Sequence, residues 1–378
     1  EEMYKKYRKV SKVELRPLLD KNVTRNRSNP TINNYAKIKM NDKGNCPFLD
    51  NEKLCMIQKS IGAGYLSKVC MTYPRVTNIV NGVCEKSATM SCPEAARIAL
   101  LNDKPMEFDE TEEPGEVQNI VNGDIDTESI KYSNKVKKYF WPLRIFSISI
   151  LQNRNYELGE RLIILGSFVG KVQQYVENEE VHNIPKLINE YNSMIEDRFF
   201  KKYIDGIPAN LAIQMQLMKE FNDQRFAIAI TPNTKAYLQC VIEFLQGINY
   251  DDKSTVEEIT ARYEEAYTNY YNPFMKEHEY ILENFLVNHI FKDFFPISSD
   301  EGVFDDYMKL VIHYSLIKML LIGMSAHYKQ LNEDIIIKLI YSFSRAIDHN
   351  KVFLNNTYKL FRENGYNTMA YMVILIKN

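Results

Sequence analysis

Five of the six cysteines of this chain lie close enough in sequence to share one chemical task. They fall between residues 46 and 92, and they are Cys46, Cys55, Cys70, Cys84 and Cys92. Thiolates are soft ligands, and zinc or an iron–sulfur cluster needs about four of them within a few ångströms. Because the chain carries no secretory signature, this grouping favours a bound metal over disulfides.

The surroundings of these cysteines support a metal site, whereas their spacing leaves an alternative open. None of the gaps is the C-x-x-C knuckle of a zinc ribbon, so the cysteines could also be unligated and packed as small apolar side chains. Cys46 precedes Pro47, as in the Cys-Pro step found beside iron–sulfur ligands. Arg75 would offset the negative charge of several thiolates. The spacing does not decide between zinc and an iron–sulfur cluster.

Two polar residues further along the chain are candidates for catalysis. Arg345 and His349 are four residues apart and would share one face of a helix, with His349 as a proton acceptor. A purely structural hydrogen-bonding pair is the alternative. A second candidate is the tyrosine cluster within 263–271, next to two glutamates. It predicts either an aromatic, acidic pocket for a lysine side chain or an amphipathic helix with partly exposed tyrosines.

The composition is that of an ordinary globular protein. The 378 residues are 45% hydrophobic and 25% charged, and the formal net charge is −2. No global field therefore draws the chain to nucleic acid or to an anionic membrane. The first residues are charged and do not form a signal peptide, so we expect a cytoplasmic protein. The apolar stretch Leu310–Tyr328 contains His313 and Lys318, which favours a buried core helix over a membrane span.

The elements that must position these residues fall into three regions. Residues 1–105 form a cysteine-rich, metal-binding module with helices in Tyr4–Asn22, a strand in Tyr35–Met40 and a helix that starts at Pro93. Residues 106–129 are acidic and poor in apolar side chains, which predicts a flexible linker. Residues 130–378 show helical periodicity almost throughout. The predicted fold class is mainly α, with short strands in the first module and a large all-helical domain after it.

At this point the sequence resembles a known family, the flagellin lysine-N-methylases. The cysteine phrases CPFLDNEKLCMIQKSIGAGYLSKVCMTYPR and SCPEAAR carry the resemblance most specifically. Weaker matching phrases follow in the same order, namely WPLRIFSISILQNRNYELGERL, ENFLVNHIFKDFFP and SRAIDHN. The resemblance therefore covers most of the chain.

The resemblance implies an S-adenosylmethionine-dependent enzyme that methylates surface lysines of flagellin and carries an iron–sulfur cluster, for which 4Fe-4S is the candidate type. Carried over position by position, the metal ligands are the following four cysteines: Cys46, Cys55, Cys70 and Cys92. Arg75 and Tyr73 are the candidates for contacting the cofactor. Family members begin with a further cysteine-dense segment that this chain lacks, so the cluster could be incomplete or absent here.

The residues themselves leave other functions open. No strand, glycine-rich turn and helix form a Rossmann-type fingerprint for S-adenosylmethionine; Gly62-Ala63-Gly64 is the nearest candidate, and no alternating strands and helices surround it. The alternative function is a non-catalytic, metal-stabilised helical module that binds another protein. Neither the oligomeric state nor the catalytic base follows from the sequence.

Overall fold

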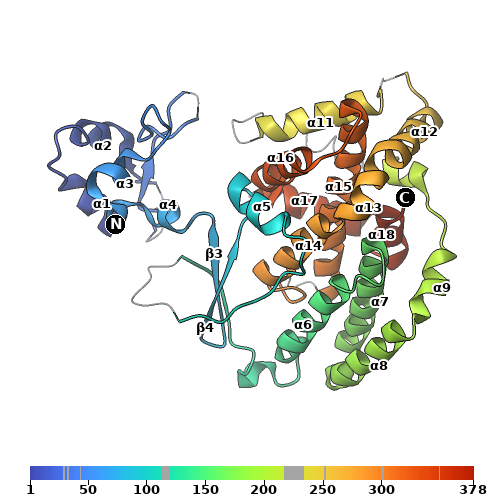
Figure 1. Cartoon of the computed structure of the whole chain (residues 1–378). Helices are drawn as coiled ribbons and strands as arrows, with labels where there is room; N and C mark the ends of the chain where they lie inside the picture. The colour runs from blue at the N-terminus through green and yellow to red at the C-terminus, as the bar shows by residue number, and fades with distance from the viewer. Residues whose placement is uncertain are drawn as a thin grey trace. The chain divides into compact units, whose positions relative to one another are not determined.

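The computed structural model describes the chain apart from residues 29, 32–33, 43, 113–119, 217–233, 251–252, 299–301 and 349, and apart from the side chains of 351–353. Its contacts divide the chain into two compact units. Unit 1 comprises Glu1–Tyr73 and Glu112–Ile120, and unit 2 comprises Pro74–Thr111 and Val121–Asn378 (Figure 1). Helices dominate, which confirms the predicted mainly α fold class.

Unit 1 is a small module built around its own apolar core. Tyr7, Leu15, Phe48 and Ile57 are buried in that core. The helices and strand predicted for its first forty residues are confirmed, with α2 starting beside Pro17 as the first turn of a helix allows. The elements are α1 (Glu2–Arg8), α2 (Arg16–Asn22), β1 (Val23–Arg25), β2 (Ala36–Ile38), α3 (Met56–Ile61), η1 (Ala63–Tyr65) and α4 (Lys68–Thr72).

Unit 2 begins with a three-stranded sheet in the order β4-β3-β5. Strands β3 (Arg75–Val80) and β4 (Val83–Ala88) form an antiparallel hairpin around Asn81-Gly82, whose positive φ angles of 51° and 79° suit a two-residue turn. Strand β5 (Val121–Ile125) pairs with β3 in parallel. This strand lies in the acidic segment that the sequence predicts as a flexible linker, because its pairing partner is remote in sequence and leaves no local signal.

Helices form the rest of unit 2, as predicted for residues 130–378. In the amino-terminal half they are α5 (Pro93–Leu100), η2 (Ile130–Tyr132), η3 (Val136–Tyr139), α6 (Phe140–Leu151), α7 (Leu158–Glu177), η4 (Val181–Asn183), α8 (Ile184–Glu196) and α9 (Phe199–Asp205). Those that follow are α11 (Lys235–Gly247), α12 (Val256–Ala266), η5 (Tyr267–Tyr271), α13 (Asn272–His278), α14 (Tyr280–Lys292), α15 (Val303–Tyr328), α16 (Glu333–Phe343), η6 (Ser344–Asp348), α17 (Lys351–Glu363) and α18 (Met369–Ile376).

The longest helix of this bundle, α15, lies among the other helices of unit 2 (Figure 1). It is long and apolar enough to cross a membrane, but 94% of its most apolar window is buried inside the protein. The helix packs closely on α11, since a Cβ atom on Gly247 would lie 1.8 Å from the carbonyl oxygen of Gly323. Burial on all sides agrees with the predicted core helix.

Two turns of this bundle are π-helical. They are η5, which follows α12, and η6, which follows α16. The sequence predicts helix across both positions, and this prediction is confirmed. The sequence does not show that these turns are π-helical instead of α-helical. Short π segments occur often at functional sites, so both turns mark places where side chains can be presented in an unusual way.

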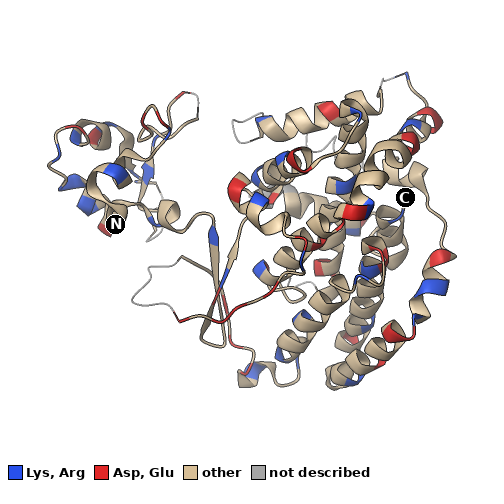
Figure 2. Ribbon diagram, in the orientation of Figure 1, with Lys and Arg blue, Asp and Glu red and all other residues tan. Residues whose placement is uncertain are grey.

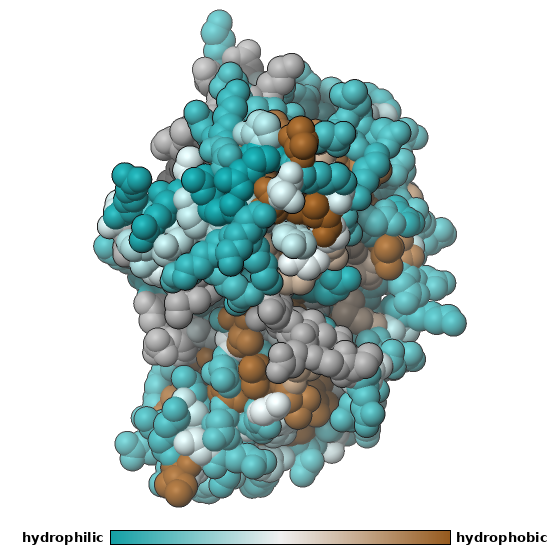
Figure 3. All heavy atoms as spheres, turned by 90° about the vertical axis from the view of Figure 1, so that its left-hand side faces the viewer, coloured by the Kyte–Doolittle hydropathy of each residue, from teal (hydrophilic) through white to brown (hydrophobic). Residues whose placement is uncertain are grey.

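Charge is spread over the surface without a field of one sign. Figure 2 shows basic and acidic residues mixed along the helices of unit 2, in keeping with the net charge of −2. The face shown in Figure 3 is mostly hydrophilic, with smaller groups of hydrophobic residues between.

Candidate functional site

The six cysteines are all free thiols, and they are distributed over both units. Unit 1 holds Cys46, Cys55 and Cys70. Cys92 belongs to unit 2, where it caps the amino terminus of α5 as the Ser-Cys-Pro phrase suggests. Of the two cysteines left out of the predicted ligand set, Cys84 lies in β4 and Cys240 is buried in α11.

The three thiols of unit 1 influence Tyr7 and one another electrostatically. Burial raises the pKa of Tyr7, and charge on Cys70, Cys55 and Cys46 raises it further. Burial likewise raises the pKa of Cys46, with Cys70 and Cys55 adding to the effect. All three cysteines therefore belong to one electrostatic neighbourhood of unit 1.

The sequence predicts these three thiols as metal ligands. Among the residues that the structure describes, no three Cys, His, Asp or Glu side chains converge tightly enough to hold a metal ion. The donor chemistry suits a soft metal, whereas the arrangement as it stands does not close a coordination shell. The candidate cofactor contacts are also divided, because Tyr73 ends unit 1 as an exposed side chain and Arg75 begins β3 of unit 2.

Unit 2 contains a cavity of about 240 Å³, which is close to the lower end of the usual range for small-molecule sites, roughly 300–1,000 Å³. Its walls come from the start of α7, from η5, from the α13–α14 junction, from α15 and from the end of α18. The lining residues that carry polar or aromatic groups are Glu157, Glu160, Tyr267, Tyr271, Asn272, Lys276, Glu279, Tyr314, Lys318, Lys377 and Asn378. We call this cavity the tyrosine pocket.

Three tyrosines supply the aromatic walls of the tyrosine pocket. The π turn η5 brings the rings of Tyr267 and Tyr271 into a stack, with centroids 5.7 Å apart and planes 25° from parallel. Tyr314 comes from α15, which follows η5 by more than thirty residues in the sequence. Burial raises the pKa of Tyr271 and Tyr314 far above the ordinary value, so both hydroxyls keep their protons and the rings act as neutral faces.

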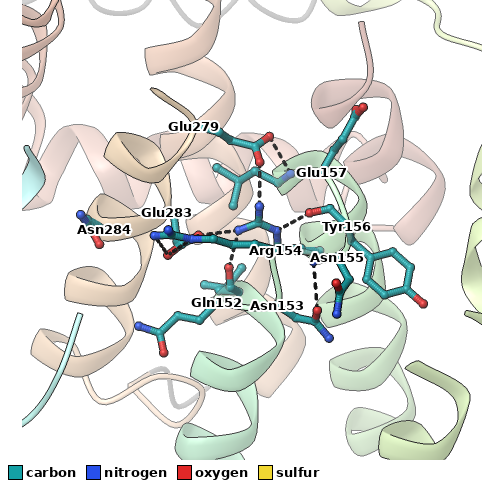
Figure 4. A network of polar contacts seen from close by, with 12 residues as sticks. Gln152, Asn153, Arg154, Asn155, Tyr156, Glu157, Glu279, Glu283 and Asn284 are labelled. Carbon is teal, nitrogen blue, oxygen red and sulfur yellow. Dashed lines mark hydrogen bonds and ion pairs between the residues drawn. The ribbon is translucent and has the colours of Figure 1, made fainter. Parts of the chain in front are cut away.

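The acidic wall is fixed by a network of ion pairs (Figure 4). The carboxylate of Glu279 accepts hydrogen bonds of 2.7 Å from the backbone N–H of Leu158 and from the guanidinium of Arg161. Arg161 also donates to Glu283 at 2.6 Å, and Glu283 accepts from Arg154 at 2.9 Å. Burial raises the pKa of Glu279, while Arg161 and the Leu158 N–H act in the opposite direction and favour the carboxylate.

A buried lysine completes the tyrosine pocket. Lys318 is only 7% exposed, and its Nζ donates a hydrogen bond of 2.9 Å to the carbonyl oxygen of Ile376 at the end of α18. The same Nζ lies 5.7 Å from the ring centre of Tyr267 and 5.8 Å from that of Tyr314. Burial lowers the pKa of Lys318 to about 8, although Glu279 and Glu157 favour the ammonium form.

Two kinds of group in the tyrosine pocket attract a cation, although three lysines line it as well. Aromatic faces and carboxylates both attract a positively charged group such as an ammonium or a sulfonium. The sequence located part of this site, since Tyr267 and Tyr271 belong to the tyrosine cluster singled out above. Tyr263 is buried instead, where its hydroxyl accepts from the side chain of Asn378. Sequence reasoning missed Tyr314, Glu279 and Lys318 as site residues.

Of the predicted pair Arg345 and His349, the structure describes only Arg345, because residue 349 lies outside the described residues. The guanidinium of Arg345 is exposed and donates from Nε to the backbone oxygen of Ser91 at 2.7 Å. Arg345 therefore ties η6 to the residue just before Cys92, which is a structural contact within unit 2.

A further polar network, which the sequence did not predict, connects η6 with α14 and α15. Asp348 is 3.3 Å from Nε2 of His313, whose ring centre is 5.1 Å from that of His289. His289 in turn lies 3.4 Å from Asp293. Burial lowers the pKa of His289 to about 4, so this ring is neutral at pH 7.

Comparisons with known proteins point to one family. Residues 144–375 match the model of the FliB lysine N-methylase C-terminal domain. Lysine-N-methylases of Salmonella choleraesuis and Salmonella typhimurium are 21% identical over 326 residues, which is 84% of this chain and 76% of each relative. The flagellar biosynthetic protein FliU of Salmonella muenchen is 40% identical over 60 residues, 16% of this chain and 35% of that protein. No solved structure matches.

Proposed function

The chain belongs to the FliB lysine N-methylase family and is thus a lysine N-methyltransferase, and we propose that the substrate lysine reacts in the tyrosine pocket of unit 2. The observation that carries this placement is the combination of Tyr267, Tyr271 and Tyr314 with the carboxylate of Glu279 around one cavity. All these residues lie within the matched segment, 144–375. An aromatic, acidic cavity accepts the apolar stem and the amine of a lysine side chain together.

We propose S-adenosylmethionine as the methyl donor. Its sulfonium is a cation, and the features that attract an ammonium, neutral tyrosine rings and fixed carboxylates, also attract a sulfonium. Transfer to an amine is a direct displacement, so the enzyme must hold both reactants in line and keep water out. The buried walls of the tyrosine pocket support this role without a Rossmann-type nucleotide site.

We propose flagellin as the protein substrate and the cytoplasm as the place of reaction. Support for a flagellar substrate comes from the matched stretch of a relative named as a flagellar biosynthetic protein. The six free cysteines suit a reducing compartment.

We also propose an iron–sulfur cluster in unit 1, for which Cys46, Cys55 and Cys70 supply ligands. The support is their shared electrostatic influence on Tyr7 together with the affinity of thiolates for iron–sulfur clusters. Cys92, the fourth predicted ligand, stays a prediction. Their thiolates would bind the iron atoms of such a cluster.

The decisive experiment incubates the chain with S-adenosylmethionine and unmodified flagellin under reducing, iron-replete conditions. Peptide mass spectrometry then reads the lysines for added methyl groups. We expect methylated flagellin lysines only when both the chain and the donor are present. Binding of the donor, measured by calorimetry without flagellin, separates a failure of donor binding from the wrong choice of protein substrate. Unmodified lysines despite donor binding would contradict flagellin as the substrate.

A further inference from the structure

The buried amine of Lys318 is a group of the tyrosine pocket that methyl transfer itself does not explain. A substrate lysine is an ammonium in water, since its pKa is about 10.4, and only the neutral amine can attack a methyl group. A proton acceptor is therefore needed beside the substrate nitrogen. We propose that Lys318 is this acceptor and takes the proton from the substrate lysine before methyl transfer, an inference that rests on the proposed function.

The geometry places the Lys318 amine where a substrate amine would arrive. Lys318 follows Tyr314 by one helical turn of α15, so both side chains line the same wall. Its Nζ lies within 6 Å of two ring centres and donates a hydrogen bond to the backbone oxygen of Ile376. An amine carries a single lone pair when neutral, and rotation about the last side-chain bond turns that lone pair toward the cavity.

The charges that face Lys318 come from every wall of the tyrosine pocket. They and the other titratable groups there are Glu157 and Glu160 on α7, Tyr267 and Tyr271 on η5, Lys276 on α13, Glu279 before α14, Tyr314 on α15, and Lys377 after α18. Glu279 is already engaged by Arg161 and by the Leu158 N–H. Both contacts favour the carboxylate form of Glu279, which makes it a weaker proton acceptor than burial alone would.

Binding of the two reactants shifts the balance further toward a neutral Lys318. The substrate ammonium and the donor sulfonium each bring a positive charge into the tyrosine pocket. Like charges within a few ångströms disfavour the ammonium form of Lys318, so one proton of the two amines is lost to solvent. Lys318 is then the neutral amine, and a proton transfer from the substrate ammonium to Lys318 leaves the substrate amine neutral.

The acceptor and the donor of this proton are well matched. Proton transfer is efficient when the two pKa values are close. Lys318, with its pKa of about 8, differs from a free lysine by about two pH units, whereas an ordinary carboxylate differs by about six. The same burial that lowers the pKa of Lys318 acts on the entering substrate amine, which narrows the difference further.

The step balances without any additional reactant. The substrate nitrogen gives one proton to the lone pair of Lys318 Nζ and then uses its own lone pair to form the new N–C bond. The C–S bond of the sulfonium breaks at the same time, and its electron pair stays on sulfur, which leaves a neutral thioether. Lys318, now an ammonium, releases its proton to water as the products depart.

A structural role is the alternative for Lys318. Its hydrogen bond to Ile376 satisfies a carbonyl at the carboxy-terminal end of α18, which a positive charge also stabilises. Arginine can make the same bond but does not lose its proton in proteins. Lys318→Arg therefore keeps the structural contact and removes the proposed chemistry.

The test compares pH–rate profiles of the wild-type chain and Lys318→Arg with S-adenosylmethionine and flagellin as substrates. We expect a fall in kcat of at least about 100-fold with little change in KM, since general base catalysis contributes about that much. Activity of the variant should recover as pH rises, because hydroxide or water then takes the proton. The control is Lys309→Arg, on the same helix but paired with Asp306 outside the pocket, which should keep the wild-type profile.

Other outcomes would overturn the inference. A wild-type chain that methylates no lysine refutes the proposed function and this inference together. An active Lys318→Arg variant with the wild-type profile refutes only the inference. Direct titration of the isotopically labelled Lys318 amine provides a readout without activity, and a pKa near 10.5 would exclude it as the acceptor. Methyl groups found on Lys318 itself would identify it as a substrate instead.

Discussion

The guanidinium of Arg161 lies 2.6 Å from the carboxylate of Glu283, and the two side chains are only 3% and 1% exposed. The same guanidinium reaches Glu279 at the wall of the tyrosine pocket. A buried charge that loses its partner is strongly destabilising, whereas an intact pair roughly balances the loss of hydration. This pair therefore holds the acidic wall in place at the cost of making the fold depend on both residues.

Arg161→Met should destabilise the chain by about 3–5 kcal/mol, because the buried Glu283 would keep only the half-exposed Arg154 as its cation and Glu279 would lose its ion pair. The measurement is urea unfolding followed by far-ultraviolet circular dichroism. The double variant Arg161→Met with Glu283→Leu should recover part of this loss. Lys186→Met is the control, since its pair with Glu190 is exposed and such pairs contribute about 0–1 kcal/mol. An Arg161→Met loss no larger than the control's would contradict the network.

Tyr267→Ala should lower kcat/KM for flagellin methylation about 5- to 30-fold. The reason is the loss of one aromatic face, which contributes about 1–2 kcal/mol to binding a partly desolvated cation. Tyr267→Phe keeps the face and should retain most of the activity. Tyr203→Ala removes a tyrosine that is 61% exposed and lies outside the tyrosine pocket, so its activity should equal that of the wild type. Steady-state kinetics with quantified methyl incorporation distinguish these variants.

Changing Cys46, Cys55 or Cys70 to serine should weaken metal binding by more than about tenfold. Mutating a residue that only hydrogen-bonds to a metal ligand typically lowers metal affinity 10- to 100-fold, and loss of a ligand itself lowers it more. Iron and zinc analysis with a visible spectrum provides the measurement. Cys240→Ser is the matched control: burial raises the pKa of that thiol to about 11, so it stays protonated and uninvolved. Equal metal content in all four variants would refute the proposed ligands.

The free energy of unfolding should fall as the pH drops from about 6.5 to 4. His289 has a pKa of about 4 in the fold, against about 6.5 in the unfolded chain. In this window the unfolded chain binds the proton more readily, so acid favours unfolding by up to about 2–3 kcal/mol. Above pH 6.5 the ring is neutral in both states and the contribution is constant.

Urea unfolding at several pH values checks this dependence. His289→Gln removes the titrating ring, so its unfolding free energy should change less between pH 6.5 and 4 than that of the wild type. His182→Gln replaces an exposed histidine and should keep the wild-type pH dependence. An unchanged slope in His289→Gln would show that other groups cause the acid sensitivity.

Much of the fold could be predicted because the signals are local. Helical periodicity located the helices of unit 2, and Pro93 after Cys92 marked the start of α5. The hairpin of β3 and β4 was missed even though Asn81-Gly82 is a strong turn signal between two apolar runs. Strand β5 had no such signal, since it is stabilised by pairing with β3, which is distant in sequence.

The site was less predictable because its residues meet only in the folded chain. Tyr267 and Tyr271 stood out by their local density. Glu279 gave no local signal, since its importance comes from Arg161, more than a hundred residues earlier. Lys318 was noticed only as a polar group in an apolar helix. No short motif connects these positions, so periodicity and spacing cannot assemble them.

The π turns η5 and η6 have a consequence for comparing relatives. A π turn winds more residues into one revolution than an α turn does. A homologue that lacks the extra residue at Tyr267–Tyr271 would continue as a regular α-helix, and its later side chains would be rotated by about 100° around the axis. A one-residue gap at this turn in an alignment would therefore identify relatives in which the stacked rings of Tyr267 and Tyr271 have a different orientation.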